Sequence, residues 1–398
     1  MTSAQQSLLV AFWACTVLTA YAYAIYPLLV WSLSGWLGRS SSTSLQDPER
    51  WPDLTLLIAA YNEEAVIEER ILNALAMDYP PDRLEVVIGL DGCSDGTASI
   101  VRRFDDRRLR VLEYSHRRGK ASVLNAAMAE IGSEIVMMSD ANTAIDPHAA
   151  RGLVRWFRDP AVGAVVGRLI LTDPRTGRNV DSLYWKYETF LKRCEGRLGA
   201  LLGANGAIYA IRREIYVPIP PETIIDDFVI PLLAKLRSGG AIVYDYYAVA
   251  REETPADVSS EFHRRARIGA GGFQSIALLW RLLDPRRGWV ALTFFSHKVL
   301  RWLCPFFLIG LFASNLLLLD RPYFGWTLGA QMAFYGVSLL ADLVPKRIKL
   351  PKLIRLMTMF TSMNAALLLG FVRWISRRQN AAWRRTARIA ASDDGALR

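Results

Sequence analysis

Short apolar runs alternate with polar, helix-forming stretches in the middle of the chain. The apolar runs are Leu54–Ala60, Leu84–Leu90 and Glu134–Met138, and the first helix-forming stretch is Ala65–Ala76. Strands that are apolar along their whole length are typical of a sheet covered by helices on both faces. The pattern therefore predicts a doubly wound α/β domain, in which strands and helices alternate along the chain.

Much longer apolar runs lie toward both ends of the chain. Leu8–Leu33 contains no charged residue, and three further uncharged runs follow toward the C-terminus: Trp302–Leu319, Pro322–Ala341 and Leu356–Val372. Each of these runs approaches or exceeds the length needed to cross a bilayer. No basic residue precedes the first run, which favours an uncleaved anchor over a cleaved signal peptide.

Basic residues beside these runs predict their orientation. The linker Lys346–Lys352 holds four basic residues, so we expect it on the cytoplasmic side. The tail, residues 376–398, is also basic, yet four full crossings place it on the opposite side. Two interpretations stay open: the last run is re-entrant or interfacial, or the charge rule fails there.

The basic excess of the chain points to a membrane surface rather than to nucleic acid. Lys and Arg exceed Asp and Glu by ten, and the arginines cluster beside apolar runs instead of along one soluble face. The four cysteines form no C-x-x-C pair, and the four histidines show no H-x-x-x-H spacing, so neither a disulfide scaffold nor a histidine-based zinc site is supported. A membrane transporter is the non-enzyme alternative, although the apolar runs lack the ionisable residues that transport pathways need.

Polar turns follow the predicted strands, at the edge where doubly wound sheets bind their ligands. Asp91–Thr97 follows the second strand and Ser139–Asn142 the third. The carboxylate of Asp140 and the amide oxygen of Asn142 suit Mg²⁺ or Mn²⁺, although such a pair also forms ordinary Asx turns. The basic, glycine-containing loop His116–Asn125 leads into a helix, where it suits a phosphate group.

In this combination and order, the motifs resemble those of inverting glycosyltransferases of family 2, in which a GT-A nucleotide-sugar domain is fused to membrane helices. The resemblance covers about residues 55–302. The matching motifs are Ala59-Ala-Tyr-Asn-Glu63, Asp91-Gly-Cys-Ser-Asp-Gly96, Arg118-Gly-Lys-Ala121 with Leu124-Asn125, Ser139-Asp-Ala-Asn142, Gly203-Ala-Asn-Gly206, Ile225-Asp-Asp227, His263-Arg-Arg-Ala-Arg-Ile268 and Ser296-His-Lys-Val-Leu-Arg-Trp302.

The resemblance implies a role for each matching residue. Asp227 is the implied general base, and Asp226 stands where the family more often has Glu. Asp140 and Asn142 occupy the D-x-D positions, which bind ribose, diphosphate and a divalent cation, Mg²⁺ or Mn²⁺. The implied donor-binding residues are Ala60, Tyr61, Glu63, Asp91 (at a uracil-type base), Lys120 (near the diphosphate) and Asp140. The implied acceptor-binding residues are Asn205, Gly206, Arg264, Arg267 and Ile268.

Two departures from the family pattern affect these expectations. Asn142 replaces the second Asp of D-x-D, which weakens the metal site or requires other ligands. Many processive synthases carry Q-x-x-R-W where this chain reads Arg264-Arg-Ala-Arg-Ile268. Ile268 lacks the indole that stacks on a sugar ring, so the sequence favours one or a few additions to a lipid-linked saccharide over long-chain synthesis.

These expectations combine into a GT-A α/β domain with flanking transmembrane helices. The predicted regions are a transmembrane anchor (residues 1–38), a cytosolic catalytic domain (39–272), an amphipathic interfacial helix (273–297), transmembrane helices (298–375) and a basic tail (376–398). A core helix is the alternative for the amphipathic stretch.

The predicted protein is an integral protein of a bacterial-type inner membrane with its catalytic domain in the cytoplasm. It transfers a sugar with inversion from a nucleoside-diphosphate donor, a UDP-sugar, to a lipid-linked or saccharide acceptor, in cell-surface or exopolysaccharide synthesis. Its other partner is the lipid bilayer, and no nucleic acid is expected. A processive synthase of a long β-linked polysaccharide is the alternative enzyme.

Overall fold

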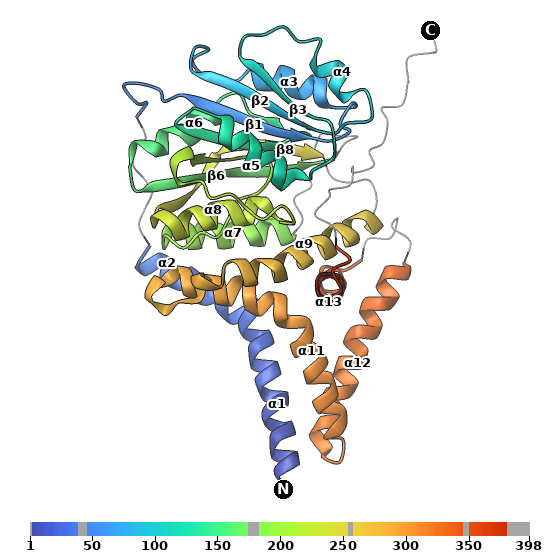
Figure 1. Ribbon diagram of the computed structural model, residues 1–398. Helices are drawn as coiled ribbons and strands as arrows, with labels where there is room; N and C mark the ends of the chain where they lie inside the picture. The colour runs from blue at the N-terminus through green and yellow to red at the C-terminus, as the bar shows by residue number, and fades with distance from the viewer. Residues whose placement is uncertain (1, 39–45, 174–182, 254–257, 345–349, 380–398) are drawn as a thin grey trace. The chain divides into compact units, whose positions relative to one another are not determined.

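The computed structural model describes residues 2–38, 46–173, 183–253, 258–344 and 350–379 (Figure 1). The chain forms two compact units. The first, here the helical unit, comprises Met1–Val30, Ser259–Ala277 and Phe294–Gln379. The second, here the sheet unit, comprises the described residues of Trp31–Val258 and Leu278–Thr293.

The sheet unit is built on an eight-stranded mixed sheet with the strand order β3-β2-β1-β4-β7-β6-β8-β5. β1 to β4 run parallel to one another, whereas β7 is antiparallel to both of its neighbours, and β5 is antiparallel to β8. The strands are β1 (Leu54–Ala60), β2 (Leu84–Asp91), β3 (Leu109–Tyr114), β4 (Ile135–Asp140), β5 (Ala144–Ile145), β6 (Val162–Thr172), β7 (Tyr209–Arg212) and β8 (Ala241–Glu253).

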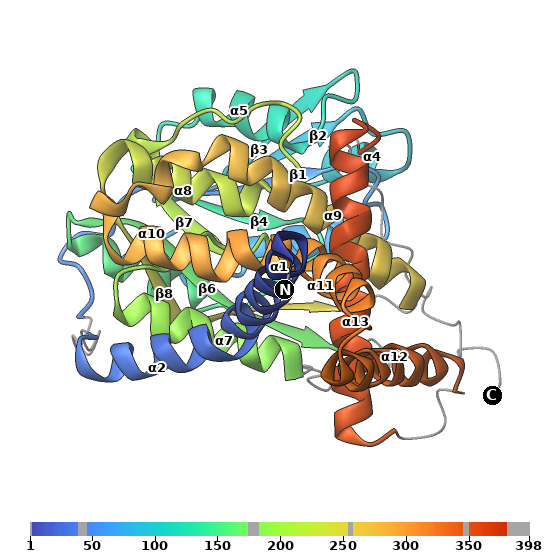
Figure 2. The same cartoon turned by 90° about the horizontal axis from the view of Figure 1, so that it is seen from below.

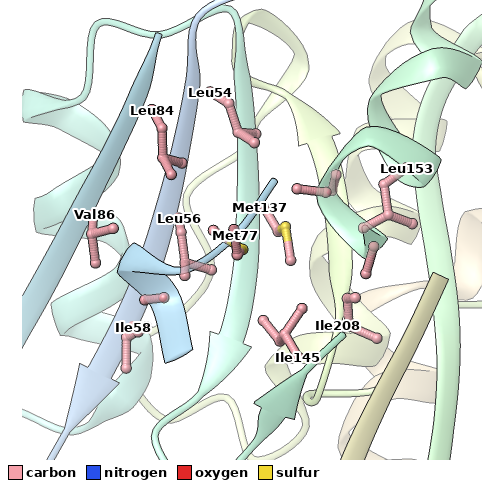
Figure 3. Close-up of a cluster of buried hydrophobic side chains, with 14 of the residues drawn as sticks. Leu54, Leu56, Ile58, Met77, Leu84, Val86, Met137, Ile145, Leu153 and Ile208 are labelled. Carbon is pink, nitrogen blue, oxygen red and sulfur yellow. The ribbon is translucent and has the colours of Figure 1, made fainter. Parts of the chain in front are cut away.

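Helices bury both faces of this sheet, which is why its central strands are apolar throughout. On one face, alternate residues of β1 such as Leu56 and Ile58 pack against α3 (Ile67–Leu75), α4 (Thr97–Val101) and α6 (Ala149–Arg155) (Figure 3). The other face is covered by helices that include α5 (Lys120–Glu130), α7 (Leu183–Arg197) and α8 (Asp226–Ser238) (Figure 1). Short 3-10 turns and α10 complete the unit: η2 (Trp156–Arg158), η3 (Arg213–Ile215), η4 (Trp280–Leu283), η5 (Pro285–Arg287) and α10 (Trp289–Thr293).

The predicted α/β architecture is confirmed, and the first predicted strand has the bounds of β1. The sheet is mixed because the four-residue strand β7 enters it between β4 and β6 in the antiparallel direction. Nothing in an apolar run of that length indicates the direction in which it will pair. The strand begins shortly after the Gly203–Gly206 segment, which is one of the predicted site motifs.

The helical unit holds the long apolar helices. Its elements are α1 (Ser3–Ala20), the π-helical turn η1 (Tyr21–Ile25), α2 (Tyr26–Trp36, which continues into the sheet unit), α9 (Val258–Leu278), the π-helical turn η6 (Phe294–Val299), α11 (Leu300–Leu317), α12 (Pro322–Leu343) and α13 (Lys352–Ile375). Within the described residues, three helices are long and apolar enough to cross a membrane: Ser3–Trp36, Trp289–Leu317 and Lys352–Ile375. The fourth predicted run forms α12, which is not among these three.

The last apolar run lies across the others in the helical unit. Figure 1 looks along the axis of α13, whereas α1 and α11 are seen lengthwise. Figure 2, seen from below, shows α13 lengthwise instead. Close packing on α9 holds it there: a Cβ on Gly370 of α13 would lie 2.6 Å from the Ala266 carbonyl oxygen. Phe273 of α9 meets Phe371 and Trp374 of α13 at ring-centroid distances of 5.1 and 6.0 Å.

The predicted amphipathic stretch, residues 273–297, is divided over several elements. It comprises the end of α9, the 3-10 turns η4 and η5, α10 and most of η6. Pro285 and Gly288 interrupt it, and Gly288 adopts a φ of +58° that other residues rarely adopt. The place of this stretch at a membrane surface stays a prediction.

Candidate active site

Two loops at the carboxyl ends of β1 and β2 are joined by hydrogen bonds. The parallel pairing aligns Ala60 with Leu90, so the turns that follow lie side by side. The backbone N–H of Ser94 donates to Asn62 Oδ1 at 2.9 Å, and the N–H of Gly96 donates to Glu64 Oε2 at 3.0 Å. Side chains of the loop after β1 thus cap the backbone of the loop after β2. In the other direction, the N–H of Glu64 donates to Asp95 Oδ2 at 3.3 Å, so the two loops form one rim.

Asp91 ties a third loop to this rim. Its carboxylate is fully buried and accepts hydrogen bonds from the backbone N–H groups of Arg118 at 2.6 Å and Gly119 at 2.9 Å. A Cβ on Gly92 would lie 2.5 Å from the backbone nitrogen of Arg117, so only glycine allows this approach. Because Gly119 is the N-cap of α5, these contacts fix the point where Lys120 begins the helix.

The predicted donor-binding residues lie together along this rim. Ala60 and Glu63 are buried, and the N–H of Glu63 donates to Thr97 Oγ1 at 2.8 Å. Tyr61 is partly exposed, and the guanidinium carbon of Arg117 lies 3.9 Å from its ring centroid. Such a cation–π pair offers a flat surface and a positive charge, the combination that suits a nucleotide.

Lys120 links the two acidic motifs of the sheet unit. Its Nζ lies 2.7 Å from Asp140 Oδ1 and 3.0 Å from Asp226 Oδ2. Burial disfavours the charged ammonium, but the two carboxylates outweigh it and raise the pKa of Lys120. Since the ammonium stays charged at any physiological pH, the carboxylates hold a positive charge between them.

Gly206 allows a close approach to Asp140. The N–H of Asp140 donates to the Gly206 carbonyl oxygen at 3.0 Å, and a Cβ on Gly206 would lie 2.5 Å from Asp140 Oδ2. At the other end of the same segment, the N–H of Ala204 donates to the Asp227 carbonyl oxygen at 3.0 Å. The Gly203–Gly206 segment therefore spans from the Asp140 carboxylate to the start of α8.

Asn205 is a buried member of this segment. Its Nδ2 donates to the Gly167 carbonyl oxygen at 3.0 Å, and its Oδ1 accepts from the N–H of Ile208 at 3.2 Å. Both ends of the amide thus hold the surrounding backbone. Contact of Asn205 with an acceptor stays a prediction.

The acidic pair forms the first turn of α8. Burial raises the pKa of Asp227 to about 6, and the neighbouring charge of Asp226 acts in the same direction, whereas Lys120 and Lys192 oppose it. A carboxylate that titrates near neutral pH can both accept and release a proton under physiological conditions. Asp226 instead lies against Lys120, as an ion-pair partner.

The Asp140–Asn142 pair supplies two oxygen ligands for a cation. Among the described residues, no three His, Cys, Asp or Glu side chains are grouped to hold a metal ion by themselves. However, Mg²⁺ and Mn²⁺ in nucleotide sites often take only one or two protein ligands, the rest being phosphate oxygens and waters. Asp140 and Asn142 supply a carboxylate and an amide oxygen, and Lys120 shows that Asp140 accepts a cation as neighbour. The donor set therefore fits such an ion.

The predicted acceptor residues of α9 belong to the helical unit. Arg264 Nε and Arg265 Nε each lie 2.8 Å from a carboxylate oxygen of Glu261. Ile268 is 38% exposed, one helical turn further along. Asn205 and Gly206 lie in the sheet unit, so the five predicted acceptor residues are divided between the two units.

Several residues that hold the site were not predicted from the sequence. Arg70 Nε donates to the Asp140 carbonyl oxygen at 3.3 Å, and Asn73 Nδ2 donates to the Ile145 carbonyl oxygen at 2.8 Å. Arg70 falls on the apolar face of its helix with Ile67, Ile71 and Ala74, and a charge on a buried face is a signal that could have identified it.

Two further residues near the site were also missed. Lys192 lowers the pKa of Asp227 from α7, where it shares one helical face with the buried Glu188 and Glu195. Their spacing, at four and three residues, is the signal for that face. Asn142 Nδ2 donates to Glu252 Oε1 of β8 at 2.5 Å. No local sequence signal indicates this last pair.

Comparisons with known proteins agree on one group of proteins. The model of the family described as glycosyltransferase like family 2 matches residues 52–271. A poly-β-1,6-N-acetyl-D-glucosamine synthase of Staphylococcus aureus is 28% identical over 234 residues, which are 56% of this chain and 55% of the relative. This chain thus matches about half the length of that relative.

Two other proteins are similar over more of the chain. A β-monoglucosyldiacylglycerol synthase of Synechocystis is 25% identical over 323 residues, 75% of this chain and 67% of the relative. The solved structure of a mannosyltransferase from Pyrobaculum calidifontis, in complex with GDP-Man and Mn²⁺, superposes with a TM-score of 0.72 at 25% identity. It covers 94% of this chain and 100% of that one, so the likeness extends beyond the residues of the family match.

Proposed function

Since this chain belongs to glycosyltransferase family 2, we propose that it transfers a sugar from a nucleoside-diphosphate donor to an acceptor hydroxyl with inversion at the anomeric carbon. The observation that carries the proposal is the contact of Lys120 with both Asp140 and Asp226. Through Lys120, the Asp140 motif, expected at the leaving group, lies close to the Asp226–Asp227 motif, expected at the acceptor.

The donor diphosphate would lie at the start of α5. Lys120 supplies an ammonium there, and the loop that Asp91 holds also carries Arg117 and Arg118. Positive groups at a helix N-terminus stabilise the charge that develops on a departing diphosphate. The base would lie against Tyr61 and Arg117, with a UDP-sugar as the expected donor.

A divalent cation, Mg²⁺ or Mn²⁺, would be held by Asp140 and Asn142, and when bound it would neutralise diphosphate charge. The solved mannosyltransferase was in complex with Mn²⁺, which supports this part of the proposal. Asp140, which now contacts Lys120, would then contribute a carboxylate ligand to that ion.

Asp227 is the proposed general base. As the acceptor hydroxyl attacks the anomeric carbon opposite the diphosphate, the hydroxyl proton moves to an Asp227 carboxylate oxygen. The new C–O bond forms while the bond to the diphosphate oxygen breaks, so the configuration inverts without a covalent enzyme intermediate. A pKa near 6 leaves Asp227 ionised, and ready to accept the proton, at the pH of a cytoplasm.

The proposed acceptor is a lipid-linked saccharide that receives one or a few sugars. The similar proteins include a synthase named for a polysaccharide and one named for a glycolipid, so the comparisons allow both product types. Ile268 favours the short product, because an isoleucine lacks the π face that retains a sugar chain. Long-chain synthesis is the second candidate.

The helical unit supports a three-crossing arrangement in the membrane. In this arrangement α1, α11 and α12 cross, whereas α13, although long and apolar enough to span, lies in the interface. The start of α11, the basic linker before α13 and the basic tail would then all lie in the cytoplasm. The crosswise position of α13 in Figures 1 and 2 supports this choice and removes the charge conflict of four crossings.

Membrane topology can be tested by cysteine labelling. In a variant without native cysteines, Asp320→Cys in the α11–α12 turn should react with an impermeant maleimide on intact cells. Ser376→Cys, after α13, should react only after permeabilisation. Labelling of Ser376→Cys on intact cells would contradict the three-crossing arrangement.

Sugar transfer can be tested on the purified full-length protein in nanodiscs. UDP- and GDP-linked hexoses and N-acetylhexosamines are offered with diacylglycerol- and polyprenyl-linked acceptors, and both nucleoside diphosphate and product are measured. We expect release of one nucleoside diphosphate per sugar added to a lipid-soluble product, absent from Asp227→Asn. Equal release by Asp227→Asn would remove Asp227 from the chemistry, and a water-soluble ladder would favour long-chain synthesis.

A further inference from the structure

The amide of Asn142 has one partner from a distant part of the chain. Its Nδ2 donates to Glu252 Oε1 at 2.5 Å, across a separation of 110 residues. Strand pairing brings the two together: β5 follows Asn142 closely and pairs antiparallel with β8, with Ala144 opposite Arg251 and Ile145 opposite Ala250. Glu252, the next residue of β8, therefore lies beside the D-x-N turn, inside one compact unit.

Chemistry allows only one orientation of this amide. A carboxylate accepts hydrogen bonds and cannot donate them when ionised, so Glu252 faces the NH₂ end of Asn142 and not its oxygen. The bond therefore turns Oδ1 away from Glu252. A cation binds the oxygen end of an asparagine, and the wrong rotamer would present N–H groups to it.

The backbone of the turn that contains Asn142 is fixed by its neighbours, so only the orientation of the Asn142 side-chain amide is left to be set. Ala141 and Thr143 on either side of Asn142 are buried, and Asn73 of α3 binds both the N–H and the carbonyl oxygen of Ile145. An aspartate would need no orientation, because its two oxygens are equivalent. An asparagine must be oriented with its oxygen toward the ion. It also has no negative charge of its own, and Glu252, its hydrogen-bond partner, supplies one nearby.

We propose that Glu252 is the positioning residue of the cation site, fixing Asn142 with its oxygen toward the ion and restoring the negative charge that the Asp-to-Asn departure removes. The inference rests on the proposed function, since it assumes that Asp140 and Asn142 hold a divalent cation. Outer partners of metal ligands typically change metal affinity by about 10- to 100-fold when they are removed.

The test measures Mn²⁺ binding alone, without turnover, by the electron paramagnetic resonance signal of free Mn²⁺ over the full-length protein in nanodiscs. Glu252→Ala should raise the Kd for Mn²⁺ by about 10- to 100-fold. Glu252→Gln keeps an acceptor oxygen but loses the charge, so its Kd should lie between those of the wild type and Glu252→Ala. The matched control is Glu253→Gln, the exposed next carboxylate of β8, which should stay within about twofold of the wild type.

An exchange of the two groups gives a further test. Asn142→Asp with Glu252→Gln keeps the total charge and the hydrogen bond while moving the carboxylate to the ligand position. This double variant should bind Mn²⁺ at least as tightly as the wild type. Binding no tighter than that of Glu252→Gln alone would overturn the proposal.

The single variants separate this inference from the proposed function. If Asp140→Ala and Asn142→Ala no longer bind Mn²⁺ while a folded Glu252→Ala variant keeps the wild-type Kd, the cation site is supported and the positioning role of Glu252 is contradicted. If the wild type binds no Mn²⁺ and transfers sugar in excess chelator, the cation part of the proposed function falls, and the inference falls with it.

Discussion

Lys120 Nζ lies 2.7 Å from Asp140 Oδ1, although the two residues are 20 positions apart and belong to different motifs. The bond joins the first residue of α5 to the last residue of β4. A charge-assisted hydrogen bond of this length holds the motif that would face the diphosphate next to the motif that would hold its counter-ion. If the proposed function holds, leaving-group stabilisation would therefore be prepared before any donor binds.

Asp140→Ala should abolish sugar transfer. The variant removes the carboxylate ligand of the proposed cation and the ion-pair partner of Lys120, so diphosphate charge is poorly neutralised, with an expected loss of at least about 10²-fold in kcat. Wild-type activity should also vanish with a chelator and return with Mg²⁺ or Mn²⁺. Full activity in excess chelator would show that Asp140 acts without a cation.

Asp227→Asn should lower activity without unfolding the protein. The change is nearly isosteric, so donor binding should survive while kcat falls by about 10² or more. Asp226→Asn should be milder if that residue mainly orients Lys120. Turnover of Asp227→Asn close to the wild type would assign the base to another carboxylate.

The raised pKa of Asp227 also predicts two pH profiles. The base must be ionised, so wild-type kcat should rise with pH through about 6 and then level off. The free energy of unfolding depends on pH in the opposite direction to kcat. A carboxyl group whose pKa is higher in the folded than in the unfolded state destabilises the folded protein at pH values above the folded pKa. Asp227→Asn should therefore raise Tm at pH 7.5, and this gain should disappear as the pH falls from about 6 toward about 4. An Asp227→Asn variant with lowered Tm at pH 7.5 would contradict the assignment of a raised pKa.

Gly206→Ala should impair transfer through a steric effect on Asp140. The added Cβ would lie 2.5 Å from Asp140 Oδ2, so the carboxylate has to move from its place beside Lys120. We expect kcat to fall by at least about tenfold, since a displacement of about 1 Å at a reacting centre can cost 10²-fold. The control is Gly132→Ala, where a Cβ meets nothing within 4 Å. Equal effects of the two substitutions would contradict a specific role for Gly206.

Ile268→Trp should lengthen the product. An indole at this exposed position of α9 offers a π face on which a sugar can stack, so an elongated acceptor should dissociate more slowly. Product sizing by mass spectrometry should show additional sugars per lipid compared with the wild type, whereas Ile268→Leu should show none. An unchanged distribution in Ile268→Trp would place the control of product length elsewhere.

Local sequence determined much of the strand framework and of the candidate site. The apolar run Leu54–Ala60 is typical of a strand buried on both faces, and it forms one with those bounds. Polar turns after β1, β2 and β4 were predictable for the same reason: turn chemistry and strand periodicity depend on neighbours a few residues apart. The order of parallel strands then brings these turns to one edge.

Tertiary structure alone decided which of these groups touch. The contact of Asn142 with Glu252 exists because β5 pairs with β8, and that of Lys120 with Asp226 because α5 and α8 begin near one point. The antiparallel direction of β7 and the crosswise position of α13 likewise leave no trace in local hydrophobicity. Periodicity records whether a residue is buried, whereas the identity of its neighbour depends on how distant segments pair and pack, which is a property of the whole fold.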